Sequence, residues 1–484
     1  MSIARALSNA LTGLSATSRG TETVAANLAN VMTPGYARRE VALSPQSLGG
    51  NFGGVRVDGI IRHVNAGLLA EARGAAASRS DASTRVAHLR QMEQVIGLPG
   101  EAHGLETALS RFQAALSSAA ARPDDELRLA EVAHGAVALA GRLNAASNAV
   151  QAARTEAEQA ISSEVALINS SLDRVVYLNR RIAATQAEGH DSSSLQDERQ
   201  VVVDRIATIL PIQQVLREGS AVALFTREGA VLLDGTSPSR LGFSPVGQVQ
   251  PEQSLGIGLA SLVFNGQEIA PDQLRLFAGG SLGAHFDIRD RLAPRLQNDL
   301  DALAVDLHTR LSDPQVDPSL APGQSGIFID RAQPAGPVVP LGLASRLAIN
   351  GSVDPSAGGE PWRLRAGITA SGPEPASKSS VLFGLLEALN APEPPRPGST
   401  FTGTASLAAR FATVGARTVS ARVEGEGGLA VTSVRYSLLQ SRQMADGVDS
   451  DAEMQRLLQY EQAYAANARV IQAIDEMLNY LLRM

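Results

Sequence analysis

The sequence predicts a mainly α-helical chain with a β-rich part, an α+β fold built as an elongated helical bundle in which the N- and C-terminal segments pair. Both ends of the 484-residue chain carry apolar residues at heptad-like spacing, which is typical of helices that pack along a narrow stripe. Residues 211–285 show the alternation and the turns of short strands. Residues 312–400 are rich in proline and glycine, which interrupts the helical pattern and indicates an inserted distal unit.

The N-terminal stripe starts at the third residue and repeats at alternating intervals of four and three. Its large apolar members are Ile3, Leu7, Leu14, Val24 and Leu28. Two threonines, Thr17 and Thr21, weaken the middle of the stripe. The helical pattern stops at Thr33-Pro34-Gly35-Tyr36, where proline followed by glycine suits the two central positions of a type II turn.

The C-terminal stripe consists of two rows with a period of seven residues. One row is Leu457, Tyr464, Ile471 and Leu478, and the other is Tyr460, Asn467, Ile474 and Leu481. Asn467 interrupts the second row, and a polar residue in such a position often fixes the register of a helix pair at some cost in stability. Two interpretations remain open: the stripes belong to ordinary amphipathic helices on a globular core, or they pack against each other and against other copies of the chain.

The middle of the chain alternates between helix-like and strand-like sequence patterns. Residues 66–210 read as helical, with a helix start after Pro123 and a further stripe at Ile161, Ile168, Val175 and Ile182. In the strand-like part, Asn265-Gly266 after an apolar run indicates a hairpin. Helices are expected again at 286–311 and from about 406 onward, with a glycine break at 425–428.

This layout predicts three nested units. Residues 1–62 plus 441–484 are expected to form a terminal coiled-coil-like domain. Residues 63–311 plus 401–440 are expected to form a helical rod domain with the β-rich part. Residues 312–400 are expected to form an inserted distal domain or a loop-rich unit.

Composition removes several function classes. There is no cysteine, which excludes disulfides, thiolate metal sites and thiol nucleophiles. The net charge is −7, which argues against a nucleic-acid partner. No stretch approaches the ~20 apolar residues of a membrane span, so membrane insertion is not expected. The N-terminus has no apolar segment followed by a cleavage site, so a conventional signal peptide is not indicated.

One enzyme motif is present. Gly279-Gly280-Ser281-Leu282-Gly283 matches the nucleophile elbow G-x-S-x-G, between a strand-like stretch at 274–277 and a helix. Asp287 or Asp290 and then His308 would complete the order serine, acid, histidine. The 44 glycines make a chance match easy, so a purely structural turn is the better interpretation. No two of the seven histidines stand three or four residues apart, and no metal site or cofactor is predicted.

Motifs at both ends resemble one known family. At the N-terminus these are Ser8-Asn9-Ala10-Leu11-Thr12-Gly13-Leu14 and the run from 26 to 36, whose motif residues are Asn27, Asn30, Pro34, Gly35 and Tyr36. At the C-terminus they are Gly447-Val448-Asp449, with Asp451, Glu453 and Met454, and the run Tyr460-Glu461-Gln462-Ala463-Tyr464-Ala465-Ala466-Asn467. With these paired motifs the chain resembles the flagellar rod, hook and hook-associated protein family. The resemblance covers about residues 1–310 and 400–484, and Asp197-Glu198-Arg199 contributes to it.

The resemblance implies a non-enzymatic structural component of the bacterial flagellum, at the junction between hook and filament and required for filament assembly. It implies self-assembly into a ring, contacts with the hook protein and with a second hook-associated junction protein, and export without signal cleavage by the flagellar type III apparatus and its export chaperone. The location would be extracellular. A hook or distal-rod axial subunit is the alternative, although such a subunit would usually lack the long helical stretch at 66–210. A serine hydrolase using Ser281 is a remote alternative.

Overall fold

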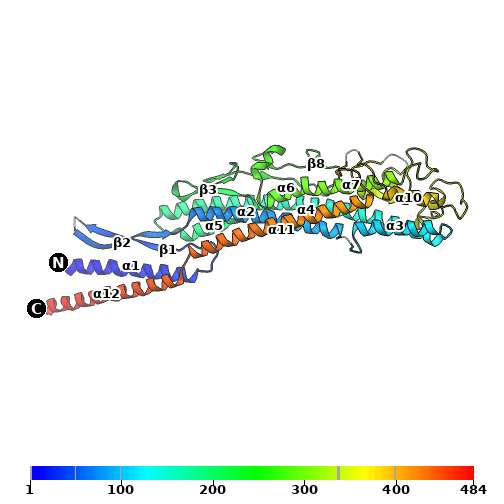
Figure 1. Cartoon of the computed structure of the whole chain (residues 1–484). Helices are drawn as coiled ribbons and strands as arrows, with labels where there is room; N and C mark the ends of the chain where they lie inside the picture. Colours follow the sequence, from blue (N-terminus) through cyan, green and yellow to red (C-terminus); the bar gives the residue numbers. More distant parts are fainter. Residues whose placement is uncertain (1–2, 49–50, 99, 335–337, 397–398, 484) are drawn as a thin grey trace.

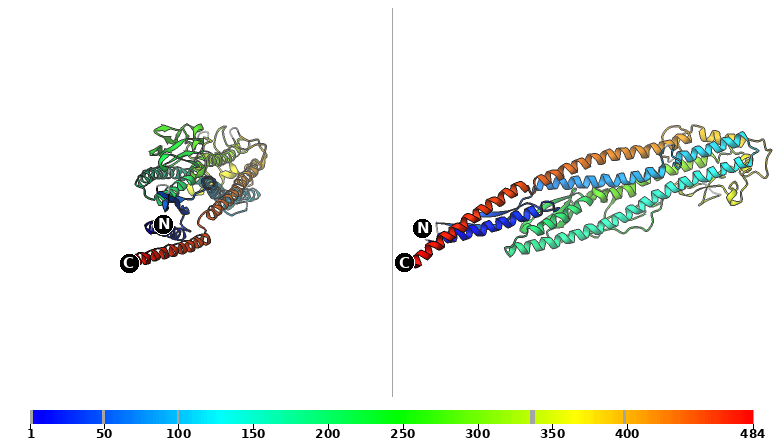
Figure 2. Two further views of the ribbon diagram at one scale, coloured as in Figure 1. Left: turned by 90° about the vertical axis from the view of Figure 1, so that its left-hand side faces the viewer. Right: turned by 90° about the horizontal axis from the view of Figure 1, so that it is seen from below.

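The molecule is an elongated bundle with both chain termini at one end (Figure 1). This computed structural model describes residues 3–48, 51–98, 100–334, 338–396 and 399–483. Helices dominate, and the strands form small sheets along the side of the bundle (Figures 1 and 2). The mainly helical α+β class expected from the sequence is confirmed.

The terminal end contains two helices and one long hairpin. Helix α1 (Ile3–Ala29) runs antiparallel to α12 (Ser450–Arg483), and strands β1 (Arg39–Leu48) and β2 (Asn51–Arg62) lie against α1. The hairpin is antiparallel, with Val41 opposite Ile60. It is fastened to α1 where the backbone N–H of Val55 donates to Thr12 Oγ1 at 3.3 Å.

The rod consists of long helices packed side by side. These are α2 (Ala66–Ile96), α4 (Glu126–Ala187), α5 (Ser193–Ile209), α6 (Gly280–Asp287), α7 (Ala293–Arg310) and α11 (Leu407–Ala445), with the π-helical turn η3 (Ile288–Leu292) joining α6 to α7. Helix α4 has 62 residues, which at 1.5 Å per residue makes it about 93 Å long. Its start is capped by Asp125, whose side chain accepts from the backbone N–H groups of Leu127 and Arg128.

The glycine break expected at 425–428 is wrong, because α11 continues through these residues without interruption. Packing outweighs the low helix propensity of glycine here. A side chain at Gly425 would lie 3.2 Å from atoms of Val86 and Leu89 on α2, so the glycine lets the two helices approach closely.

The β-rich part covers one side of the proximal rod. A four-stranded antiparallel sheet has the order β3 (Ile212–Leu216), β4 (Val222–Thr226), β5 (Val231–Asp234) and β6 (Ser237–Pro238). Smaller pairings follow between β7 (Leu241–Gly242), β10 (Val263–Phe264) and β11 (Gln267–Glu268), and between β8 (Ser254–Leu255) and β9 (Gly258–Leu259). The hairpin expected at Asn265-Gly266 is present, with positive φ at both residues.

The strand expected at 274–277 is wrong. These residues belong to the 3-10 helix η2 (Pro271–Phe277). Proline at its first position presets a helical φ, and Asp272 in the first turn favours the positive end of the helix dipole.

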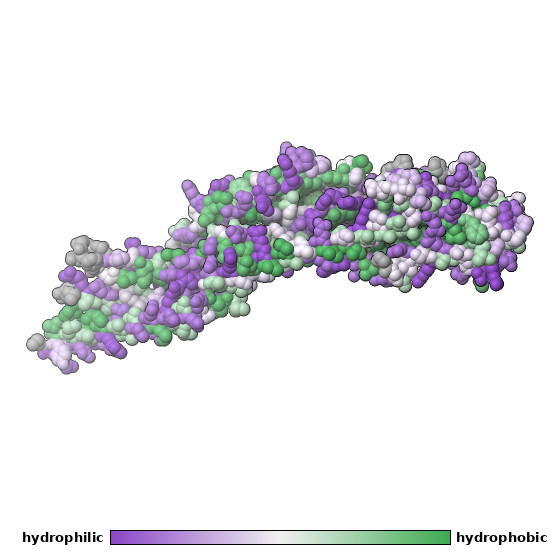
Figure 3. Space-filling model, in the orientation of Figure 1, coloured by the Kyte–Doolittle hydropathy of each residue, from purple (hydrophilic) through white to green (hydrophobic). Residues whose placement is uncertain are grey.

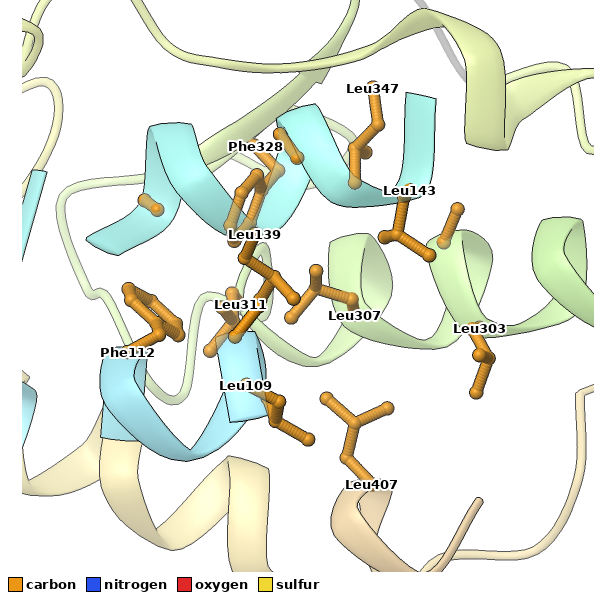
Figure 4. Close-up of a cluster of buried hydrophobic side chains, with 14 of the residues drawn as sticks. Leu109, Phe112, Leu139, Leu143, Leu303, Leu307, Leu311, Phe328, Leu347 and Leu407 are labelled. Atoms are coloured by element: carbon orange, nitrogen blue, oxygen red, sulfur yellow. The ribbon is translucent and has the colours of Figure 1, made fainter. Parts of the chain in front are cut away.

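The distal end combines α3 (Leu105–Ala121) with residues 312–400. The latter form β12 (Phe328–Asp330), α8 (Leu343–Arg346), β13 (Leu347–Ile349), η4 (Pro355–Ala357), α9 (Arg363–Ala366) and α10 (Ser380–Asn390). Apart from η4, these elements share one hydrophobic core with α3, α4, α7 and α11. Figure 4 shows the side chains converging, with the rings of Phe112 and Phe328 5.8 Å apart.

A buried ion-pair cluster reinforces this core. Asp306 lies between Arg310 (Nε to Oδ1, 3.1 Å) and Arg410 (Nη1 to Oδ2, 2.7 Å), and all three side chains are almost fully buried. Arg310 also donates to the carbonyl oxygens of Ala388 and Ala391 at 2.7 and 2.6 Å, where α10 ends. The guanidinium of Arg310 therefore ties residues 312–400 to the rod.

Candidate functional site in the terminal helix pair and its joint

The terminal helix pair packs through glycine notches. Gly13 and Gly20 on α1 are seven residues apart, as are Asn467 and Tyr460 on α12. A Cβ built at Gly13 would stand 2.8 Å from Asn467 Nδ2, and one built at Gly20 would stand 2.5 Å from Tyr460 Cζ. Each larger side chain on α12 thus lies where α1 has no side chain, which fixes the register of the antiparallel pair.

The predicted packing stripe is only partly buried within one chain. Val24 and Ile474 are buried. Eight members are half-buried, namely Ile3, Leu7, Leu14, Leu28, Leu457, Tyr460, Asn467 and Ile471. Three members are exposed, namely Tyr464, Leu478 and Leu481. One chain therefore brings α1 and α12 together but covers only one side of their apolar surface.

The C-terminal half of α12 has a broad apolar side that one chain leaves largely exposed. Beyond the two predicted rows, sequence reasoning missed further exposed apolar residues, of which Tyr480 is 74% and Leu482 is 85% exposed. Val470 and Met477 add to this surface. Figure 3 shows apolar surface at this end of the molecule. A contiguous exposed apolar surface of this kind is typical of a protein–protein contact site, so this side of α12 has the character of an interface.

Asn27 occupies the centre of the joint between the helix pair and the rod. Its fully buried amide Nδ2 donates to the carbonyl oxygen of Arg39 at 2.8 Å and to Glu453 Oε2 at 2.9 Å. Its Oδ1 accepts from the hydroxyl of Tyr36 at 2.8 Å and from the backbone N–H of Arg39 at 3.0 Å. All hydrogen-bonding positions of the amide are used, so Asn27 links α1, the following turn, β1 and α12 in one network.

Glu453 anchors α12 to this network. Its carboxylate is 1% exposed and pairs with Arg456 at 2.7 Å and with Arg38 at 3.4 Å, both through Oε1. The guanidinium of Arg39 lies 4.7 Å from the centre of the Tyr36 ring. Burial is the main cause that raises the pKa of the Tyr36 phenol, so Tyr36 stays protonated and remains a donor to Asn27.

Asp197 on α5 connects the hairpin to the rod. It accepts from Arg39 Nη2 and Arg62 Nε, both at 2.6 Å, and from the backbone N–H of Ala37 at 3.3 Å. Arg62 also donates a hydrogen bond from Nη2 to Gln200 Oε1 at 2.5 Å. The sequence placed Asp197 in a family motif but predicted no such role for it, because its partners lie more than 130 residues away in the chain.

The turn that follows α1 has the geometry expected from its residues. The backbone N–H of Tyr36 donates to the carbonyl oxygen of Thr33 at 3.2 Å, and Gly35 has a φ of 79°. Gly35 also lies against Val201, since a Cβ there would be 2.5 Å from Val201 Cγ2. Asn30 acts locally: its Nδ2 donates to Ala26 oxygen at 2.9 Å and its Oδ1 accepts from Thr33 Oγ1 at 3.1 Å.

The groups of the serine hydrolase hypothesis have other partners. The side chain of His308 lies 3.3 Å from Ser325 Oγ, Asp287 pairs with Arg85 and Arg291, and Asp290 pairs with Arg289. Ser281 instead hydrogen-bonds to Glu164 on α4. Burial raises the pKa of Glu164 to about 7, an effect that this hydrogen bond partly offsets. Ser281 therefore belongs to helix packing between α4 and α6.

Within the described ranges, no group of three or more histidine or acidic side chains is arranged to hold a metal ion. The same residues contain no helix whose length and apolar character would let it span a bilayer.

Comparison with known families matches three parts of the chain. Residues 89–317 match the flagellar hook-associated protein FlgK helical domain. Residues 444–484 match the C-terminal region of the flagellar basal body rod FlgEFG proteins, and residues 7–36 match the flagella basal body rod protein family. The last two matches fall on α12 and α1, which the structure brings together.

Curated relatives bear one name. Flagellar hook-associated protein 1 of Bacillus subtilis is 22% identical over 98% of this chain and 97% of its own length. The protein of the same name from Salmonella typhimurium is 24% identical over 62% of this chain and 54% of its own length, so the match spans about half of that relative. The solved flagellar hook junction protein FlgK from Burkholderia pseudomallei is 23% identical, with a TM-score of 0.44 over 56% of this chain and 46% of that one. Both terminal helices, the helical rod and, in one relative, nearly the whole length of the chain are therefore similar to flagellar hook-associated protein 1 and its flagellar relatives.

Proposed function

We propose that this protein is a structural subunit of the junction between the flagellar hook and filament, and that its terminal helix pair is the surface through which copies assemble. The observation that carries the proposal is the broad apolar side of the C-terminal half of α12, which α1 covers only in part. Burying one such large apolar side chain contributes about 1.5–3 kcal/mol, so burial of several by neighbouring copies would hold a ring together.

The ring would contact the hook protein on one side and a second hook-associated junction protein on the other. The subunit would leave the cell through the flagellar type III apparatus, escorted by an export chaperone, and act outside it. A chain without cysteine suits this route, because no disulfide can form before the subunit has reached its place.

The match of residues 89–317 to the hook-associated helical domain supports a junction subunit over the alternative of a hook or distal-rod subunit. A junction subunit and a hook or distal-rod subunit are distinguished by where the protein lies on the flagellum. Antibody labelling of isolated hook–basal bodies in electron micrographs should mark a band at the distal end of the hook. Labelling along the hook or at the rod would contradict the junction proposal and support the alternative.

The role of the terminal helix pair in assembly can be tested by placing a charged side chain on the exposed apolar side of α12. Leu481→Asp changes a side chain that is already exposed, so the free monomer should keep its stability, while the variant should be lost from the junction by at least tenfold. Asp475→Asn, at an exposed position of the same helix, is the matched control and should assemble normally. Normal incorporation of Leu481→Asp would contradict the role given to α12.

A further inference from the structure

The outer face of α11 carries an apolar stripe that the described residues leave uncovered. We define this α11 stripe as Val423, Gly427, Val431, Val434 and Leu438, which recur every three or four residues. The valines are 54%, 70% and 69% exposed and Leu438 is 52% exposed. Four large apolar side chains in one row on a solvent-facing helix are unusual for a surface without a partner.

The stripe points away from the rod. The opposite side of α11 is occupied by α2, where Leu439 is buried with Ala72 and Ala75. At Gly425 the same side of α11 approaches Val86 and Leu89 of α2. Packing within the chain therefore uses the inner side of α11 and leaves the outer one free.

A second outer face lies at the opposite edge of the rod. The right-hand view in Figure 2 places α11 at one edge and α4 at the other, with α2 between them. On α4, the residues Ala166, Leu167, Ser170 and Tyr177 are exposed, and we call them the α4 face. Its small residues leave room for the side chains of an approaching helix.

The two faces stand at the same height along the rod. Arg85 of α2 pairs with Asp287 of α6, and His285 of α6 lies 3.8 Å from Glu164 of α4, which sets these residues at one level. Val86 and Leu89 in turn place Gly425 of α11 close to that level. From there α4 and α11 run in the same direction toward the terminal end (Figure 2). A few further residues along each helix lead to the α4 face and to the α11 stripe.

Charges beside the two faces are complementary. Arg435 and Arg442 flank the α11 stripe, are exposed and form no ion pair with any described residue. Exposed carboxylates of Asp173 and Glu198 flank the α4 face, where each pairs with an arginine of its own chain. An approaching copy would bring two further cations to these acids.

We propose that the α11 stripe of one copy docks on the α4 face of the next copy, side by side in the ring. The interface is heterologous, with different surfaces on its two sides. Repeating this contact from copy to copy around an axis gives a closed ring of rods, or a helical array if the rotation does not close. The proposal rests on the proposed assembly of the junction and adds to it a second contact, along the rod, independent of the terminal helix pair.

The absence of native cysteine allows a direct test by cross-linking. A double variant, Val434→Cys with Ser170→Cys, places one thiol on each face. Flagella isolated from cells that produce it are treated with a short bis-maleimide and analysed on a denaturing gel. Head-to-tail contacts should give a ladder of dimers, trimers and larger species, and each single variant should give no ladder. The control pair Val434→Cys with Ser237→Cys uses an exposed position off the α4 face and should give no ladder.

The outcomes separate the two proposals. Absence of the unsubstituted chain from isolated hook–filament structures contradicts the junction function. A double-cysteine variant that is incorporated without forming a ladder overturns the α11–α4 interface and leaves the junction function intact. A second variant covers the case in which the cysteine protein is not incorporated. Val434→Glu should reduce incorporation at least tenfold relative to Gln440→Glu, at an exposed position on another side of α11, and equal incorporation overturns the interface.

Discussion

The distal core and the terminal helix pair of this protein differ in how completely one chain buries its apolar residues. At the distal end, side chains from α3, α4, α7, α11 and residues 312–400 interlock, and Leu139, Leu143, Leu303 and Leu307 are fully buried. At the terminal end, α1 and α12 touch through small notches, and most of the apolar surface of α12 remains exposed. The comparison indicates that the distal end is stable in a single chain, whereas the terminal end is completed by its neighbours.

The largest effect is expected in the distal core. Asp306→Asn removes the charge between Arg310 and Arg410. Among the described residues Arg410 then has no carboxylate partner, and Arg310 keeps only Glu393, at 3.7 Å. Breaking such a buried pair typically costs about 3–5 kcal/mol, which urea unfolding of the free monomer would measure. Asp173→Asn breaks the exposed pair with Arg240 and should cost less than about 1 kcal/mol. Similar values for the two variants would contradict the claim that the distal core is self-contained.

An intermediate effect, dependent on pH, is expected in the proximal rod. Burial raises the pKa of Glu164 to about 7, and its Oε2 has no hydrogen-bond partner among the described residues. The folded state therefore holds the proton more tightly than the unfolded chain. This contribution is fully present below the ordinary glutamate pKa and is lost as pH rises toward 7.

Glu164→Gln, which mimics the protonated acid, should remove this loss. Between pH 5 and pH 8 the unsubstituted chain should lose about 1–3 kcal/mol of unfolding free energy relative to the variant. His285, whose pKa burial lowers, acts in the opposite direction, but it is present in both proteins. Glu156→Gln on the exposed side of α4 is the control. Parallel stability curves for the Glu164→Gln variant and the parent chain would argue against the buried acid.

A smaller effect is expected in the terminal pair. Alanine is favoured over glycine in a helix interior by about 1 kcal/mol, so Gly20→Ala would stabilise α1 if packing were irrelevant. Because the added Cβ would meet the ring of Tyr460, we expect a loss of about 1 kcal/mol instead, seen as faster amide exchange in α12. Gly74→Ala on α2, where the added Cβ meets no atom within 4 Å, should stabilise its helix. If Gly20→Ala also stabilises, the notch has no role in packing.

The sequence predicted the helical class, the hairpin at Asn265-Gly266 and the turn at Pro34-Gly35, because each depends on residues close together in the chain. It predicted a break at 425–428 that does not exist, since the contact of Gly425 with α2 links residues more than 330 positions apart. The same limit hid the roles of Asn27 and Asp197, whose type is visible in the sequence but whose partners are not.

The terminal stripe shows most clearly what heptad spacing can predict and what it cannot. Heptad spacing marked Ile474 and Leu481 equally, yet Ile474 is buried against α1 and Leu481 is exposed near the end of the helix. Spacing reports that a helix has an apolar side, and it does not report whether the same chain or another one covers that side. Tyr480 and Leu482 lie outside the two heptad rows, so spacing alone did not mark them, although they widen the apolar side of α12.

Hydrogen exchange of the free monomer and of assembled junctions tests the central claim most directly. In the monomer, the amides of residues 467–483 in α12 should exchange at least a hundredfold faster than those of residues 129–153 in α4. In the assembled structure the two segments should be protected to a similar degree. Equal protection of both segments in the free monomer would contradict the claim that neighbouring copies complete the terminal end.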